Sequence, residues 1–273
     1  MKPITTKQLR SILHPRTSDS HKGTYGHSLL VAGNVGKMGA AVIAARACLR
    51  SGTGLLTVCV PMEERLAIHA TVPESMVVFR EQAIPVHSFS AIGVGPGIGT
   101  SGREKKLLKN ILQQASCPLV LDADALNLVA ADPKLKAMLP PGSILTPHPK
   151  EFDRLFGTHD TEDARSRTAI EQATRHQLVM VLKGHHTLVT SGSETCFNTT
   201  GNAGLAKGGS GDALTGMITA LLAQGYKPFE AAIAAVYLHG HAADLTLHQQ
   251  SMESMLISDV IENIGLAFQS VRK

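Results

Sequence analysis

The chain has no tryptophan, and only 4% of its 273 residues are aromatic. Proteins that bind single-stranded nucleic acid rely on aromatic rings that stack on bases. The net charge is only +4, and the densest basic stretch, REKKLLKN at 103–110, is typical of a solvent-facing helix surface. We therefore expect no nucleic-acid partner.

Cysteine pairs and long apolar runs are also missing. No C-x-x-C spacing occurs among the four cysteines, which argues against a zinc site and a disulfide framework; they are Cys48, Cys59, Cys117 and Cys196. The N-terminal MKPITTKQLRSILHP has no apolar h-region, and no run approaches the roughly 20 apolar residues of a membrane span. These absences predict no membrane partner and a cytoplasmic location.

Short apolar runs do alternate with amphipathic stretches. We predict strands at 28–33, 55–60, 76–79, 91–95, 118–122, 143–147 and 178–183, and an edge hairpin from 186–190 and 195–198. Helices are predicted at 39–52, 101–115 and 255–271. This alternation is typical of an α/β fold with a central, mostly parallel sheet and helices on both faces. No repeat or linker occurs, so residues 1–273 are predicted to form a single domain.

Polar or glycine-rich segments follow six strand ends: GNVGKMGA, GPGIGTSG, DADALN, TPHPKE, KGHHT and GGSGDA. In a parallel sheet, ligands bind beyond the carboxyl ends of the strands. The six segments therefore predict one continuous rim around a ligand site.

Several familiar motifs are weak or incomplete. GIGTSG at 97–102 has the form G-x-G-x-x-G, and Asp122 follows Gly102 by 20 residues. This pattern is typical of a dinucleotide-dependent dehydrogenase. Because the motif lies a third of the way along the chain, it indicates such an enzyme only weakly. GNVGKM has Met38 where a P-loop needs serine or threonine. No G-x-S-x-G or H-E-x-x-H occurs. His239 and His241 would face nearly opposite sides of a helix, so they are a poor metal pair.

Two strand ends leave a structural and a functional interpretation open. The acids of DADALN, Asp122 and Asp124, can cap the next helix or hold Mg²⁺ through water; we favour capping for Asp122 and a place on the site rim for Asn127. His148 precedes Pro149, which suits the first turn of a helix. This histidine can bond to backbone or contact a ligand, and the sequence favours the two equally.

The strongest signal is NTTGNAGLAKGGSGDALTG, in which five glycines between Gly201 and Gly211 precede Asp212. Glycine backbone at a helix start presents N–H groups to an anion. The helix dipole alone favours an acid in the first turn. Phosphoryl transfer to a hydroxyl, however, needs a base beside an anion-binding site. We therefore predict a catalytic Asp212.

With these motifs together, the chain resembles the ribokinase-like superfamily and, within it, the ADP/ATP-dependent NAD(P)H-hydrate dehydratases. The resemblance rests on HKGTYGHSLLVAGNVGKMGAA, RSGTGLLTV, GVGPGIG, LDADALN, LTPHPKEF, VLKGHHTLV and TGNAGLAKGGSGDALTGMI, in family order over residues 21 to about 245. His27 and Lys207 depart from residues common in the family. About 20 residues precede the match, so we expect a stand-alone form without the epimerase domain to which the family is often fused.

The resemblance implies a repair reaction. ADP or ATP phosphorylates the ring hydroxyl of the S form of hydrated NADH or NADPH, and phosphate then leaves, which restores the intact cofactor and releases AMP or ADP. Both nucleotides fit the sequence, as do both hydrated cofactors. Phosphoryl transfer predicts Mg²⁺, although the sequence indicates no ligands for it. The resemblance implies a homo-oligomer, a tetramer.

Matched motif by motif, the resemblance makes Asp212 the base, beside an anion hole formed by Gly209, Ser210 and Gly211. It implies a nucleotide site formed by Lys183, Gly184, His185, His186, Thr187 and Gly211. It places the hydrated dinucleotide against Ala41, Gly97, Asn127, His148 and Asp212.

Two other functions remain open. A kinase of the same superfamily, acting on a vitamin-precursor alcohol such as a thiazole or pyrimidine, would also use Asp212 but would leave a stable phosphoester. A non-enzymatic nucleotide sensor would not need that carboxylate.

Overall fold

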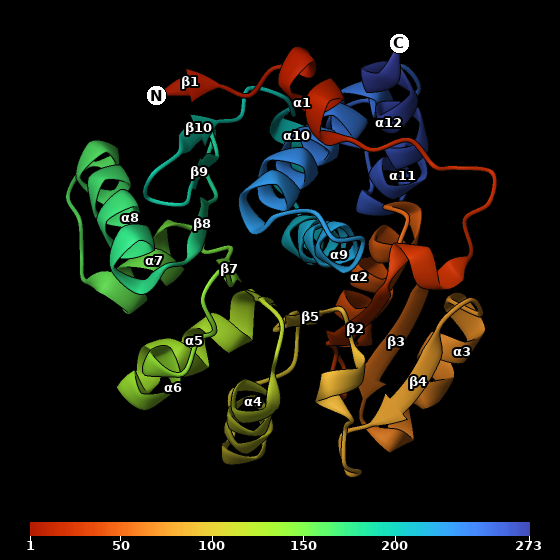
Figure 1. Cartoon of the computed structure of the whole chain (residues 1–273), viewed down its shortest axis with the longest axis vertical. Helices are drawn as coiled ribbons and strands as arrows, with labels where there is room; N and C mark the ends of the chain where they lie inside the picture. Colours follow the sequence, from red (N-terminus) through yellow and green to blue (C-terminus); the bar gives the residue numbers. More distant parts are fainter.

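The computed structural model describes residues 1–273 and contains one ten-stranded sheet (Figure 1). The strand order is β1-β10-β9-β8-β7-β6-β5-β2-β3-β4. The strands are β1 Lys2–Pro3, β2 His27–Val31, β3 Leu55–Val60, β4 Met76–Phe79, β5 Ala91–Val94, β6 Leu119–Leu121, β7 Ile144–Leu145, β8 Val179–Leu182, β9 Leu188–Thr190 and β10 Thr195–Phe197. All pairs are parallel except β8–β9 and β9–β10. The predicted strands and edge hairpin are thus confirmed, whereas the two-residue β1 is too short to show a sequence pattern.

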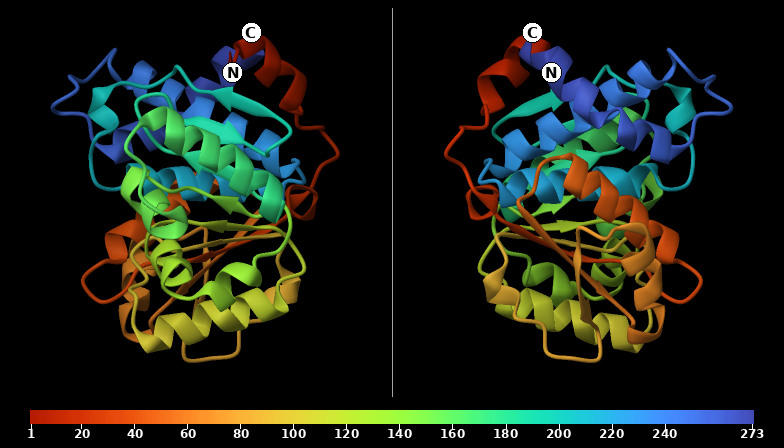
Figure 2. Two further views of the ribbon diagram at one scale, coloured as in Figure 1. Left: turned by 90° about the vertical axis from the view of Figure 1, so that its left-hand side faces the viewer. Right: turned by 90° about the vertical axis from the view of Figure 1, so that its right-hand side faces the viewer.

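Two layers of helices enclose the sheet, and Figure 2 shows the strands running between them. One layer holds α1 Thr6–Ile12, α2 Met38–Arg50, α3 Arg65–Thr71, α9 Ser210–Ala223, α10 Pro228–Thr246, α11 Ile257–Glu262 and α12 Ile264–Arg272. The other holds α4 Gly102–Gln114, α5 Ala123–Ala131, α6 Pro133–Ala137, α7 Pro149–Phe156 and α8 Glu162–His176. Short 3₁₀ turns lie at Lys22–Tyr25, Met62–Glu64, Val86–Ser88 and Ala203–Leu205. None of the helices has the length and apolarity that a bilayer span requires.

The C-terminal stretch corrects one prediction. Residues 255–271 form two helices, α11 and α12, rather than one. Asn263 lies between them, and its Nδ2 donates to Thr246 Oγ1 at 3.0 Å and to the Asp259 carbonyl at 3.1 Å. This side chain thus ties the break to α10. The apolar face continues across the break, with Val260 and Ile264 both buried.

Helix α9 is buried on all sides from Ala213 to Ala223. It packs against α2, α10 and the central strands β2, β5 and β6. Gly216 permits the close contact with α2, because a Cβ at this position would lie 2.1 Å from the Ala44 carbonyl oxygen. This packing fixes α9, and with it the side chain of Asp212 in its first turn.

The order of the strands reverses beside β2. The chain runs outward from β2 through β3 to β4, and then returns to place β5 on the other side of β2. The segments that follow β2 and β5 therefore leave the sheet in different directions, and a crevice for ligands is expected there.

We predict that Gly216→Ala lowers the free energy of unfolding by about 2 kcal/mol, because α2 must move away from the new methyl group. Urea denaturation measures this. The matched control is Gly265→Ala in α12, where a Cβ meets nothing within 4 Å and the change should be neutral or slightly stabilising. Equal effects of the two substitutions would contradict the tight α2–α9 contact.

Candidate active site

The glycine turn leads directly into α9. Gly209 is the residue before the helix and has φ 98°, and a Cβ there would lie 2.7 Å from Ile43 Cδ1. The left-handed backbone favours glycine at this position, and a side chain would also displace the end of Ile43. The amide of Ser210 makes a long bond of 3.4 Å to the Lys207 carbonyl, whereas those of Gly211 and Asp212 donate to no protein acceptor. Free N–H groups at the positive end of a helix are suited to an anion.

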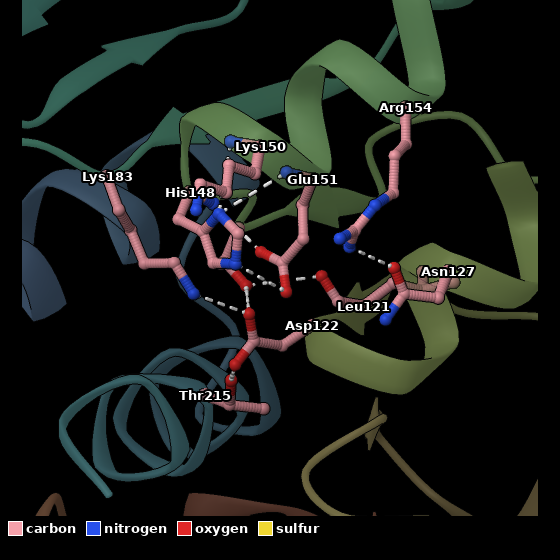
Figure 3. Close-up of polar contacts among 10 residues, drawn as sticks. Leu121, Asp122, Asn127, His148, Lys150, Glu151, Arg154, Lys183 and Thr215 are labelled. Atoms are coloured by element: carbon pink, nitrogen blue, oxygen red, sulfur yellow. Dashed lines mark hydrogen bonds and ion pairs between the residues drawn. The ribbon is translucent and has the colours of Figure 1, made fainter. Parts of the chain in front are cut away.

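A buried ion pair lies beside this turn (Figure 3). Lys183, after β8, donates from Nζ to Asp122 Oδ1 at 2.7 Å, and the Asp122 side chain is 1% exposed. Asp122 also accepts from Thr146 Oγ1 at 2.8 Å and from Thr215 Oγ1 in α9 at 3.1 Å. A Cβ on Gly211 would lie 3.2 Å from Lys183 Nζ, so the ammonium group is close to the free amides.

The pair keeps both partners charged. Burial favours the neutral forms, but the Lys183 charge and three hydrogen bonds hold the pKa of Asp122 below its usual value. Burial alone would lower the pKa of Lys183. The charge and the hydrogen bond of the Asp122 carboxylate together have the larger effect, so the pKa of Lys183 is raised.

Asp212 is partly buried next to this pair. Burial and the negative charge of Asp122 raise the pKa of Asp212 to about 6, with Asp124 adding to the rise and Lys183 opposing it. A carboxylate with a raised pKa near neutrality is a suitable general base. Asp212 is therefore ionised at pH 7 and ready to accept a proton.

The structure corrects the prediction that Asp122 caps a helix. Its side chain makes no capping bond to α5, although it occupies the residue before that helix, because the carboxylate is turned inward to Lys183. Asp124 does not cap α5 either: its Oδ2 accepts from the Gly99 amide at 2.8 Å, which ties the turn after β5 to α5.

His148 does act as a helix cap. Its Nδ1 accepts from the amides of Lys150 and Glu151 at 3.1 and 3.3 Å, and its own amide donates to Glu151 Oε2 at 2.9 Å (Figure 3). His148 also lines the larger cavity of the site, which has a volume of about 720 Å³ and is called the main cavity. The structural interpretation is confirmed, and contact with a ligand stays a prediction.

The other predicted substrate residues come from α5, α2 and the turn after β5. Asn127 Oδ1 accepts from Arg154 at 2.9 Å, on the outer side of α5 (Figure 3). Ala41 is fully buried in the core. Gly97, at φ 63°, packs on the first turn of α2, where a Cβ would lie 3.1 Å from Ala40 Cβ. Gly97 thus lies beside α2 after β5, Asn127 is bonded to Arg154, and contact of these three residues with a ligand stays a prediction.

A cavity of about 720 Å³ brings most of the predicted nucleotide residues together. Its lining includes Lys183, Gly184, His185, Thr187, Ser210 and Gly211. His186 is not part of the lining; its ring packs 4.4 Å from His185 and 6.0 Å from Phe197, between centroids. The volume is that of a typical small-molecule site.

The cavity lining also includes residues that were not among the predicted nucleotide contacts. They are Asn198, Thr200, Gly201, Asn202, Ala203, Leu205, Ala206, Lys207, Val236, His239 and Gly240. The polar run NTTGN was the available signal. Lys207 is held by the segment before α11: its Nζ donates to the carbonyls of Glu253 and Met255 at 2.6 and 2.7 Å.

A second cavity of about 420 Å³ contains Arg16, Arg50 and Arg272. It lies beside the C-terminal ends of α2 and α9. Arg16 donates to the Gly52 carbonyl just after α2, and Arg272 donates to the His14 carbonyl. These cations complement carbonyl groups near the ends of helices, and we assign them a structural role.

No group of three or more His, Cys, Asp and Glu side chains could enclose a metal. Magnesium at nucleotide sites, however, keeps several waters and needs only one or two carboxylates besides the phosphates. Asp212 and the neighbouring Asp124 have carboxylate oxygens outside any ion pair, so the residues present fit a phosphate-bound Mg²⁺.

Solved structures define the class of protein. A ribokinase-like superfamily protein from Enterococcus faecalis is 30% identical, with a TM-score of 0.90 over 100% of this chain and 97% of that one. The parallel sheet with a glycine turn opening a buried helix is therefore a ribokinase-like fold, as predicted.

The chain belongs to the NAD(P)H-hydrate dehydratase family, whose sequence profile matches residues 28–265. It is 36% identical to the ADP-dependent (S)-NAD(P)H-hydrate dehydratase of Bacillus subtilis over 97% of this chain and 98% of that one. The structure of an ADP/ATP-dependent NAD(P)H-hydrate dehydratase from the same organism, co-crystallised with ATP/Mg²⁺, has a TM-score of 0.89 at 34% identity and covers 99% of this chain and 98% of that one. The chain spans about half the length of the bifunctional NAD(P)H-hydrate repair enzyme of Moorella thermoacetica, at 36% identity over 99% of this chain.

We predict that Asp122→Asn lowers the free energy of unfolding at pH 7 by about 3 kcal/mol, because it leaves the Lys183 charge buried without a partner. Urea denaturation measures this. Because the folded-state pKa of Asp122 is lowered, its contribution is present above about pH 4 and is lost as the pH falls further. The difference between variant and wild type should therefore shrink at pH 3.

The matched control is Asp132→Asn. Asp132 pairs with the exposed Lys105 at 2.9 Å, and loss of a surface pair should change stability by less than about 1 kcal/mol. Similar losses for the two variants would contradict the buried pair as a structural constraint.

Proposed function

We propose that the chain is an ADP- or ATP-dependent (S)-NAD(P)H-hydrate dehydratase, a hydro-lyase that repairs hydrated NADH or NADPH. Membership of the family supports the reaction. The observation that carries the proposal is the Asp212 carboxylate, with its raised pKa, beside free amides at the start of α9. The arrangement pairs a base with an anion site, as phosphoryl transfer to a hydroxyl requires.

In this mechanism Asp212 accepts the proton of the ring hydroxyl while the hydroxyl oxygen attacks the terminal phosphorus of ADP or ATP. The P–O bond to the nucleotide breaks, and AMP or ADP leaves. Backbone N–H groups of Gly209, Ser210 and Gly211 hold the phosphoryl oxygens. The lone pair of the ring nitrogen then expels phosphate, and a proton leaves the neighbouring ring carbon, so the ring double bond and intact NAD(P)H are restored.

The ion pair supports this step. Lys183 lies next to the anion hole, and Asp122 holds its ammonium group in place. The nucleotide would lie in the main cavity against Gly184, His185 and Thr187, with the adjacent His186 supporting the turn. The positive charge of Lys183 would then face the phosphates, which lowers the energy of the developing negative charge.

The hydrated dinucleotide would enter between the ends of β2 and β5. Gly97 and backbone near Ala41 would contact it there, with His148 and Asn127 at the rim. A phosphate-bound Mg²⁺, when present, neutralises charge on the nucleotide phosphates. Homotetrameric assembly and a cytoplasmic location stay predictions from the sequence.

We expect the wild-type chain to restore NADH absorbance at 340 nm from chemically hydrated NADH when ADP or ATP is supplied with Mg²⁺. Asp212→Asn should bind nucleotide with similar affinity but lose turnover by about a factor of 10³, because no base remains to take the hydroxyl proton. Parallel assays with ADP and ATP, and with NADH hydrate and NADPH hydrate, define the preferred substrates.

Two outcomes would favour the alternatives. A stable phosphoester on a thiazole or pyrimidine alcohol, without recovery of NADH, would support the vitamin-precursor kinase. A chain that binds nucleotide but turns over neither substrate, with Asp212→Asn indistinguishable from wild type, would support the nucleotide sensor.

We predict that the turnover rate falls with decreasing pH, with an apparent pKa near 6, because a base must be ionised to accept a proton and the pKa of Asp212 is about 6. The charged groups around it are Asp122, Lys183 and Asp124. Initial rates between pH 5 and 8, at saturating substrates and with an enzyme-free blank at each pH, measure this. A flat profile would argue against Asp212 as the base.

A further inference from the structure

His239 is a buried histidine without a protein partner. It lies in α10, and only 6% of its surface is exposed. Its Nε2 is fully buried and makes no hydrogen bond. Two other buried side-chain atoms lack a partner, Ser51 Oγ and Arg80 Nε, but neither residue lines the main cavity, whereas His239 does. Because buried polar groups are nearly always paired, this nitrogen requires an explanation.

The wall around His239 is otherwise well bonded. Asn198 Nδ2 donates to the Thr200 carbonyl at 3.0 Å, and Thr200 Oγ1 donates to the Tyr237 carbonyl at 2.9 Å. Gly240 lets this loop lie against α10, since a Cβ there would be 2.5 Å from Thr200 Oγ1. The loop is thus fixed by hydrogen bonds that do not involve the imidazole, and His239 lines the cavity beside it.

The imidazole stays neutral at physiological pH. Burial and the positive charge of Lys183 lower the pKa of His239 to about 4. A neutral imidazole offers one N–H donor and one acceptor nitrogen. Such a ring suits an uncharged hydroxyl or ring nitrogen better than a phosphate, for which a cation is preferred.

We propose that His239 hydrogen-bonds the nucleoside part of the bound adenine nucleotide, through a ribose hydroxyl or a ring nitrogen of the base, and so contributes to nucleotide specificity. The geometry supports this with one side chain that lines the cavity and lacks a protein partner, beside Asn198 and Thr200, whose side chains are already bonded. The proposal rests on the proposed function only in taking the cavity as the ADP site.

The test compares two properties of His239→Phe, a ring of similar size without nitrogen. Isothermal titration with ADP and Mg²⁺ should show affinity roughly tenfold weaker than wild type, as for one lost hydrogen bond. The melting temperature without nucleotide should stay the same or rise, because the variant no longer buries an unpaired polar atom. A purely structural histidine would not give this opposite pair of changes.

The matched control is His241→Phe. His241 lies on the same helix, and its Nε2 is bonded to Ser270 Oγ at 2.6 Å, outside the cavity. Its substitution should leave ADP affinity unchanged. His239→Gln, which keeps a donor and an acceptor, should recover part of the affinity and serves as the test variant if His239→Phe does not fold.

Nucleotide analogues identify the bonded group. If a ribose hydroxyl is the partner, 2′-deoxy-ADP or 3′-deoxy-ADP binds wild type more weakly than ADP does, and His239→Phe abolishes that difference. If the base is the partner, the difference appears instead with inosine diphosphate, 3-deaza-ADP or 7-deaza-ADP, in which N1, N3 or N7 respectively is altered.

Unchanged ADP affinity in His239→Phe would overturn the proposal, as would a loss of affinity that accompanies an equal loss of nucleotide-free stability. These outcomes are independent of the dehydratase assay. If the wild-type chain shows no dehydratase turnover but His239→Phe binds ADP more weakly, the proposed function is wrong and the role of His239 stands. If the wild-type chain turns over normally but His239→Phe binds ADP with unchanged affinity, the proposed function stands and the role of His239 is wrong.

Discussion

The buried pair of Asp122 and Lys183 constrains the whole site. Through Asp122 it joins the ends of β6 and β8, Thr146 after β7 and Thr215 in α9. An isolated charge in this position would be strongly unfavourable, so these four segments are stable together only when the carboxylate, the ammonium and both hydroxyls meet. Because Thr215 lies one helical turn after Asp212, the same contact fixes the direction in which α9 presents its first turn.

This constraint also sets the electrostatics. Asp212 lies near a second carboxylate and is partly removed from water, so it holds its charge less readily than an exposed acid, while Lys183 prevents its full neutralisation. The amides of Gly211 and Asp212 and the imidazole Nε2 of His239 lack protein partners in the site. A nucleotide has phosphates at one end, which can accept from the free amides, and a nucleoside at the other, which can bond to the imidazole. The site is thus built around hydrogen bonds that a ligand must complete.

The predictions from sequence succeeded where the conformation of a short segment depends only on the residues within that segment. The glycine turn needs φ 98° at Gly209 and no side chain, and both requirements can be inferred from glycine itself. His148 before Pro149 likewise predicted a helix start. Asp122 was misjudged because its local position is that of a helix cap, whereas its partners, Thr146, Lys183 and Thr215, are distant in sequence. The bond from Arg154 to Asn127 was likewise not predicted, because it joins two helices, and the place of Asn127 on the site rim stays a prediction.

By itself the sequence determined the alternation of strands and helices, the glycine turn before Asp212 and the family, because these depend on local patterns and on short motifs in a fixed order. Only the tertiary structure decided that α9 is buried against Ala44 through Gly216, that Asp122 pairs with Lys183, and that His239 faces the cavity without a partner. The physical reason is that burial and charge pairing are properties of contacts between distant segments. The fold must bring those segments together before a carboxylate or an imidazole acquires its pKa and its role.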